Sequence, residues 1–223
     1  MKRVVKNILP HFICIVCLIA VSVIYFYPIL FDKGIEQSDI SQFKGMSKQI
    51  VDHRDKFNEE PYWLDNAFLG MPSFQVSARY PYDILRVIDL SIRFLPRPAD
   101  YLFLYLLSFY LLIISLKINY RFALLGALAF GFSTYLIIIL GVGHNTKALA
   151  IGYLPLVIMG VIMILNKHFL KGFLITSLAL GLQIHSNHYQ MTYYTLIMIM
   201  VIFLFYFFDY LKKNNLKIFF KII

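Results

Sequence analysis

The sequence predicts an all-α polytopic membrane protein with about six transmembrane helices and a large helical loop after the first of them. One reason is the composition. The chain is 60% hydrophobic and only 15% charged, with a mean hydropathy of +0.70, whereas soluble domains are about half apolar and about a quarter charged. The other reason is that apolar residues gather in runs near the roughly 20 residues that cross a hydrocarbon core. Helices close their backbone hydrogen bonds within such runs, so each span is expected to be a helix.

The first apolar run covers about 8–30 and follows three basic residues, Lys2, Arg3 and Lys6. A cleavable signal peptide has an apolar core of only about 7–15 residues, followed by a small-residue cleavage site. This run is longer and ends in aromatic residues typical of a membrane interface, so we expect an uncleaved span. Further spans are expected at about 100–116, 122–140, 148–165, 169–185 and 190–208.

Lysine and arginine predict the orientation of these spans. If the N-terminus is cytoplasmic, the short outer connections carry a single basic residue, Lys147. The long loop is also basic, but loops of that length contribute little to this rule. We therefore expect a cytoplasmic N-terminus and outer loops at 31–99, 141–147 and 185–190. The inner basic residues are then Lys2, Arg3, Lys6, Lys117, Arg121, Lys167, Lys171, Lys212, Lys213, Lys217 and Lys221.

The formal net charge is +9, which in a soluble protein would indicate a nucleic-acid partner. Here the basic residues flank apolar runs, as membrane insertion requires, so we exclude nucleic acid and expect membrane lipid as the partner. All acidic residues except Asp209 lie between Asp32 and Asp100, and no expected span has a carboxylate near its centre. Any chemistry is therefore expected at the outer face.

The loop at 31–99 is too long and too aromatic for a linker, and we expect it to fold as a cap. Apolar spacing predicts a helix over 38–57, with Ser38 or Asp39 as its N-cap. A turn is expected at 68–74, because glycine and proline both punctuate it.

A second cap helix is predicted over 82–96. Its apolar residues fall largely on one side, and Arg86, Asp89 and Arg93 fall on the other. Such a helix is expected to lie in the membrane interface, with arginines near lipid headgroups. The alternative is that it packs on the rest of the cap.

The last residues, NLKIFFKII at 215–223, are expected to begin a seventh helix, or else to form an amphipathic tail at the inner surface. We therefore expect 1–223 to be a single membrane domain, the N-terminal portion of a longer protein, with the outer cap at 31–99 inside it.

Two polar clusters interrupt the apolar runs on the expected outer side. In GVGHNTKALA, 141–150, His144, Asn145 and Lys147 stand where a helix begins. Helix N-termini attract anions, so these residues predict a phosphate-binding site. The alternative is a capped helix whose lysine reaches the interface.

In IHSNHYQ, 184–190, His185 and His188 are three residues apart, so one helical face is expected to present both. With Gln190 they predict hydrogen bonds to a sugar or phosphate, because polar groups at membrane depth face the bundle or a cavity. A divalent metal held by these histidines and Asp39 is an alternative. A structural polar network is another.

Four segments together resemble the YfhO-like bacterial membrane proteins, Bacteroidetes-type, of the GT-C class of glycosyltransferases. They are QSDISQF, YWLDNAFLGMPSF, GHNTKALAIGYLPL and LQIHSNHYQMTYY, in that order. The resemblance implies a GT-C-like fold in the bacterial cytoplasmic (inner) membrane. It also implies transfer of a sugar from a polyprenyl-phosphate donor to a surface glycan or other cell-envelope acceptor at the outer face.

Members of this class place a functional Asp or Glu soon after the first span, which here falls on Asp39, with Glu36 as the alternative. Glycosyl transfer needs a base for the acceptor hydroxyl, and a carboxylate at the membrane surface suits this task. Asp39 is equally suited to be a helix N-cap. The double-acid motif of the class is absent, so no metal or other cofactor is assigned.

Two other functions stay open. One is a transporter or flippase component, although transporters usually carry ionisable groups near the midplane, which these spans almost lack. The other is a non-catalytic membrane protein of surface assembly.

Overall fold

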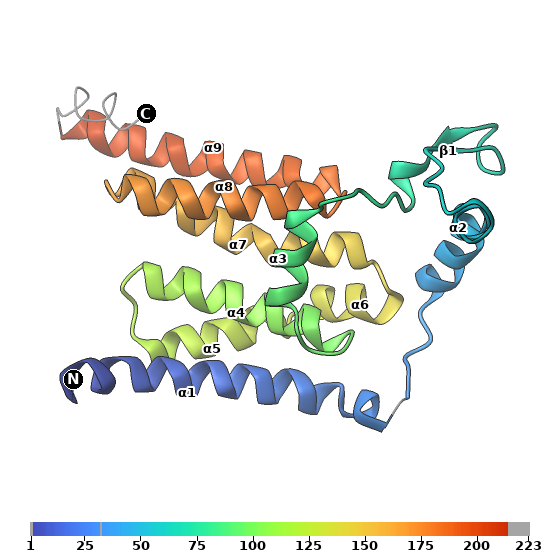
Figure 1. Ribbon diagram of the computed structural model, residues 1–223. Helices are drawn as coiled ribbons and strands as arrows, with labels where there is room; N and C mark the ends of the chain where they lie inside the picture. Colours follow the sequence, from blue (N-terminus) through green and yellow to red (C-terminus); the bar gives the residue numbers. More distant parts are fainter. Residues whose placement is uncertain (1, 32, 214–223) are drawn as a thin grey trace.

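The computed structural model describes residues 2–31 and 33–213 (Figure 1). The helix expected to begin at 215–223 lies outside these residues. The helices are α1 (Lys2–Tyr25), α2 (Ser38–Phe57), α3 (Ile84–Ile92), α4 (Ala99–Ser115), α5 (Tyr120–Gly131), α6 (Thr134–Val142), α7 (Asn145–Leu165), α8 (Phe169–His185) and α9 (Tyr189–Lys212). Short elements are the 3-10 turns η1 (Tyr27–Phe31) and η2 (Ser73–Gln75) and the strands β1 (Trp63–Leu64) and β2 (Met71–Pro72).

The helices α1, α4, α5, α7, α8 and α9 run along a common direction and form one bundle (Figure 1). Helix α4 lies at its centre, because it packs against α1, α5 and α7. Its first half is buried almost completely, and Leu102, Tyr105 and Leu106 are 0% exposed. The outer surfaces of α1 and α9 are apolar and exposed, as expected for helices that face lipid.

Among the residues that the structure describes, three helices are long and apolar enough to cross a membrane, namely Ile8–Tyr25, Asn145–Leu165 and Tyr189–Lys212. Helices α5 and α6 together make a fourth if their bent pair is one span. Helices α4 and α8 are apolar but shorter, with 17 residues each. The protein is therefore an all-α membrane protein. Its described residues contain three or four spans by length and composition, and the expected number of six is not confirmed.

The span expected at 122–140 is not a single helix. Helix α5 ends at Gly131, α6 begins at Thr134, and the two axes differ by 51°. The break occurs where Ser133 adopts an extended conformation (φ −60°, ψ 139°). Gly131 also lies against α4, since a Cβ there would sit 2.5 Å from Leu106 Cδ2. Close packing on α4 therefore accompanies a bend that an uninterrupted apolar run did not indicate.

The connections fall at two ends of the bundle (Figure 1). The cap and the α6–α7 and α8–α9 connections share one end, named here the cap end. The α4–α5 and α7–α8 connections and the end of α9 share the other, named the basic end after Lys117, Arg121, Lys167, Lys171, Lys212 and Lys213. The charge asymmetry that predicted the orientation thus coincides with the two ends. That the basic end faces the cytoplasm stays a prediction.

The cap contains the expected helix over 38–57, with the predicted boundaries. Its N-cap is Gln37, which makes no side-chain cap hydrogen bond, so neither Ser38 nor Asp39 caps it as predicted. The turn region lies in a short antiparallel hairpin with two residues in each strand, in which Trp63 pairs with Pro72. Gln49 Oε1 accepts the backbone N–H groups of Asp65 and Asn66 at 3.1 and 3.2 Å and so ties the hairpin to α2.

Helix α3 is shorter than predicted and crosses the bundle at a steep angle (Figure 1). Asp83 caps it by accepting the backbone N–H of Arg86 at 3.0 Å. Its inner face packs Leu85, Ile88 and Ile92 against α4, α7 and α8. It therefore belongs to the bundle more than to the rest of the cap.

Candidate functional site

The structure brings two of the predicted site residues into direct contact at the cap end. Asp39 lies in the first turn of α2, and His144 immediately precedes α7. His144 Nδ1 pairs with Asp39 Oδ2, although the two residues are far apart in the sequence. Their side chains are 48% and 31% exposed, so a ligand can reach both. The contact forms an imidazole–carboxylate pair, which is an arrangement that orients a histidine for proton transfer.

The backbone beside this pair shows how α2 and α7 approach. Gly143 ends α6 in the left-handed region (φ 88°), which glycine adopts without strain. A Cβ at Gly143 would lie 2.9 Å from Gln37 Cβ and 3.1 Å from Ile40 Cγ1. Gln37 Nε2 also donates to Leu140 O at 2.5 Å, satisfying a carbonyl at the end of α6. Gly143 therefore turns the chain, and its lack of a side chain leaves room for the start of α2 to pack against it.

Replacing Gly143 with alanine should disturb this joint without touching either side chain of the pair. The left-handed conformation costs a non-glycine residue about 1–2 kcal/mol, and the new methyl group meets Gln37. Gly141→Ala is the matched control, because nothing lies within 4 Å of a Cβ there. We expect Gly143→Ala to lower the melting temperature and to increase proteolytic cleavage within the cap. Gly141→Ala should do neither. Equal behaviour of the two variants would contradict this account of Gly143.

Lys147 and His188 lie close to the pair. Lys147 Nζ sits 5.3 Å from the centroid of the Tyr135 ring, a cation–π contact. Burial lowers the pKa of His188, and the positive charges of Lys147 and His144 lower it further. The Nε2 atom of His188 is buried and has no hydrogen-bond partner among the described residues. His188 is thus held towards its neutral form beside two basic side chains.

Asn145 is the first residue of α7, so its backbone belongs to the predicted anion-binding helix terminus. Its side chain makes no hydrogen bond within the described residues, and its backbone N–H donates to Gly143 O at 2.8 Å. Helices α7 and α9 contact each other along the bundle, and both begin at the cap end. The positive ends of two helix dipoles therefore point to the region of His144, Lys147 and His188.

His185 and Gln190 have other partners. His185 Nε2 lies 2.8 Å from Asp83 Oδ2, and Gln190 Nε2 donates to Tyr194 Oη at 2.8 Å. The prediction that His185 and His188 share a helical face is wrong. His185 ends α8 and His188 precedes α9, because Asn187 turns the chain in the left-handed region (φ 60°). The structure therefore groups His188 with His144, and it pairs His185 with the start of α3.

The described residues contain no group of three or more His, Cys, Asp and Glu side chains placed to hold a metal ion. The alternative ligand set of Asp39, His185 and His188 therefore has no counterpart in this part of the chain.

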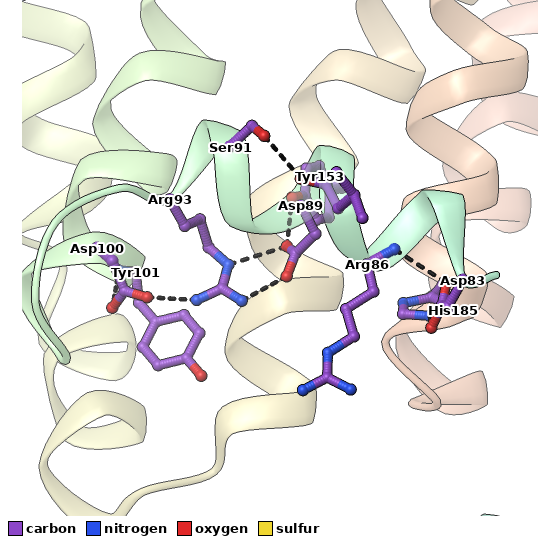
Figure 2. A network of polar contacts seen from close by, with 10 residues as sticks. Asp83, Arg86, Asp89, Ser91, Arg93, Asp100, Tyr101, Tyr153 and His185 are labelled. Atoms are coloured by element: carbon purple, nitrogen blue, oxygen red, sulfur yellow. Dashed lines mark hydrogen bonds and ion pairs between the residues drawn. The ribbon is translucent and has the colours of Figure 1, made fainter. Parts of the chain in front are cut away.

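A buried ion cluster links α3 to the bundle, and sequence analysis did not find it (Figure 2). Arg93 lies between Asp89 and Asp100 and pairs with both carboxylates. The side chains of Arg93 and Asp100 are each 2% exposed. Tyr153 of α7 donates to Asp89 Oδ1 at 2.6 Å, and Asp100 Oδ1 accepts the backbone N–H of Tyr101 at 2.8 Å.

This cluster corrects the predicted orientation of α3. Asp89 and Arg93 face the bundle, whereas Ile84, Val87 and Leu90 are exposed. Arg93 is therefore not a headgroup anchor. Buried charges are tolerated when they are paired and hydrogen-bonded, and here each partner is present. The spacing of Asp89 and Arg93, one helical turn apart, was the only signal of the pair in the sequence.

Asp89 and Arg93 stabilise each other's charged forms. Burial alone would raise the pKa of Asp89, but hydrogen bonds from Arg93 and Tyr153 leave it below its usual value. Burial alone would lower the pKa of Arg93, but the hydrogen bond and charge of Asp89 raise it above its usual value. The cluster therefore fixes α3 and the second half of the cap to α4 and α7.

No family model, curated protein or solved structure matches the chain.

Proposed function

We propose that the protein is an integral-membrane glycosyltransferase of the GT-C type. It transfers a sugar from a polyprenyl-phosphate donor to a cell-envelope acceptor at the outer face of the bacterial inner membrane. The observation that carries this proposal is the pair of Asp39 and His144, which stands beside Lys147 and His188 at the cap end. This end is the expected outer face, and a lipid-linked donor presents its phosphate at that depth.

The geometry favours His144 as the proton acceptor and Asp39 as a positioning residue. The Nδ1 atom of His144 is engaged by Asp39, and its Nε2 atom has no hydrogen-bond partner among the described residues. In such a pair the carboxylate orients the ring and stabilises the imidazolium, while the second nitrogen takes the proton. The acceptor hydroxyl would therefore meet His144, whereas sequence analysis assigned the base to Asp39.

Positive groups beside the pair suit a leaving phosphate. Lys147 supplies a full charge, and the N-termini of α7 and α9 supply the partial positive charge of their helix dipoles. Stabilisation of charge on the leaving group is usually a large part of such catalysis. Neutral His188 and the Asn145 amide would donate hydrogen bonds to the same phosphate. His185 and Gln190 would lie further out, towards the sugar or acceptor.

The proposal includes six membrane crossings, with α4 and α8 counted. Each has 17 residues and is therefore about 25 Å long at the helical rise per residue. Both lie alongside α7, whose length suits a full span. A short helix that lies beside longer spans can still cross the hydrocarbon core, because its flanking turns and snorkelling lysines cover the remaining distance.

The test compares surface-glycan sugar content in the host at matched membrane abundance of each variant. We expect loss of one sugar in His144→Gln, Asp39→Asn and Lys147→Gln, because removal of a general base alone typically costs about 100-fold or more. Asp39→Glu keeps the carboxylate and should restore part of the transfer. His53→Gln is the control, since His53 belongs to α2 as Asp39 does, but lies fourteen residues further along the helix against the Phe57 ring.

Normal glycans in all three variants would reject these site assignments and favour the transport or assembly functions. Equal loss in His53→Gln would show that the substitutions act through folding.

A further inference from the structure

A pocket of about 350 Å³ lies at the basic end of the bundle, far from the cap. It opens between the ends of the parallel helices α4 and α7, which pack against each other. Its polar wall consists of Ser115, Lys117, Asn166 and His168. Ile162 and Met163 contribute an apolar wall. A pocket of this kind can receive a ligand that has both a charged and an apolar part.

The two turns that border the pocket have the same geometry. Lys117 follows α4 and Lys167 follows α7, and both are in the left-handed region, with φ of 61° and 68°. Their backbone N–H groups donate to Ile114 O and Ile164 O, each at 2.9 Å. Glycine or asparagine adopts this conformation more easily than lysine does. A lysine at this position is favoured in part because its positive charge lies near the negative end of the helix dipole.

The basic end carries more positive charge than is needed to stabilise the C-termini of its helices. Among the described residues, neither Lys117 nor Lys167 has an ion-pair partner. Arg121 and Lys171 lie in the first turns of the helices that follow. Asp209 is the one carboxylate in the described residues of this end, and it already pairs with Lys213 at 2.7 Å. The pocket is therefore surrounded by positive charge that no described acidic residue balances.

We propose that this pocket binds the phosphate of an anionic phospholipid headgroup. Lys117 and His168 would contact the phosphate, the Asn166 amide would donate a hydrogen bond, and Lys167 would add charge at the rim. The first carbons of an acyl chain would lie along Ile162 and Met163. Basic pockets between membrane helices commonly hold anionic headgroups, because lysine close to such a surface contributes appreciable attraction. This inference does not depend on the proposed transferase function.

The test uses the full chain in nanodiscs that contain phosphatidylcholine with a minor share of phosphatidylglycerol, and native mass spectrometry counts the retained lipid. We expect selective retention of phosphatidylglycerol by the unmodified protein. Lys117→Gln should weaken it about fivefold, since one lysine near an anionic lipid is worth about 1 kcal/mol. Met163→Trp fills the pocket without changing any charge and should displace the lipid as well.

Lys212→Gln is the matched control, because Lys212 is an exposed lysine of the same end that does not line the pocket. Equal weakening by Lys117→Gln and Lys212→Gln would overturn the proposal in favour of general attraction to the membrane surface. Retention unchanged by Lys117→Gln and Met163→Trp would also overturn it. Inorganic phosphate is the last arm: if it displaces phosphatidylglycerol at low concentration, the pocket is a free-phosphate site and the lipid assignment is wrong.

Discussion

Replacing Arg93 with methionine is expected to destabilise the protein by about 3–5 kcal/mol, the usual cost of removing one partner from a buried ion pair. The substitution leaves the carboxylates of Asp89 and Asp100 buried without their common cation. Tyr153 and the backbone of Tyr101 would remain as hydrogen-bond donors, but neither carries a charge. Thermal unfolding of the detergent-solubilised protein measures the effect.

Arg86→Met is the control for this experiment, since Arg86 lies on the exposed side of the same helix and its side chain forms no ion pair among the described residues. We expect little change in its melting temperature. Neutralising both acids as well, in Asp89→Asn/Arg93→Met/Asp100→Asn, should recover much of the lost stability, because no uncompensated charge then remains. A single Arg93→Met variant as stable as Arg86→Met would show that the cluster does not hold α3 in place.

Replacing Gly160 with leucine should separate α7 from α8, the most extensively packed helix pair of the bundle. A Cβ at Gly160 would lie 2.3 Å from Thr176 Oγ1 and 2.7 Å from Thr176 N. From the other side, a Cβ at Gly172 would lie 2.7 Å from Gly160 O. Overpacking against side chains costs about 1–3 kcal/mol. Here backbone atoms block the way, so we expect a cost at or above the upper end of that range.

Gly160→Ala and Gly141→Ala provide a matched comparison. Both add one methyl group to a helical glycine, but only Gly160 lies against another helix. The alanine at 141 should be neutral or slightly stabilising, because alanine has the higher helix propensity. The alanine at 160 should lower the melting temperature, and leucine should lower it further. Equal melting temperatures for the two alanine variants would refute the close contact between the backbones of α7 and α8.

Local features of the chain were predictable from sequence. The helix over 38–57 has the predicted boundaries because apolar spacing and a helix-ending Asn58, left-handed at φ 54°, are encoded nearby. The apolar runs near residues 8, 148 and 190 likewise became long helices. The bend between α5 and α6 was not predicted, because no proline or charged residue marks it within 122–140. The close packing of Gly131 on α4 beside the break is a tertiary contact, which the local sequence does not show.

The sequence predicted which residues belong to the site better than it predicted which of them touch. Asp39 and His144 were both expected at the outer face, and the structure adds that they touch. That contact depends on the fit of α2 over Gly143, which spacing along the chain does not contain. Arg93 was placed on the wrong side of α3, because this helix has apolar residues around most of its circumference. Which face is buried then depends on Asp100 and Tyr153, which lie on other helices.

The contact between Asp39 and His144 joins two parts of the molecule, since one residue belongs to the cap and the other to the bundle. A displacement of α2 away from α7 would separate them and leave the imidazole without its orienting carboxylate. Under the proposed mechanism, a cap displaced in this way would be inactive, and the arrangement seen here would be the active one. A ligand that bridges the two parts would favour the closed state in proportion to its preference for it. Substrate binding would then assemble the catalyst, and a donor bound without its acceptor would be hydrolysed less often.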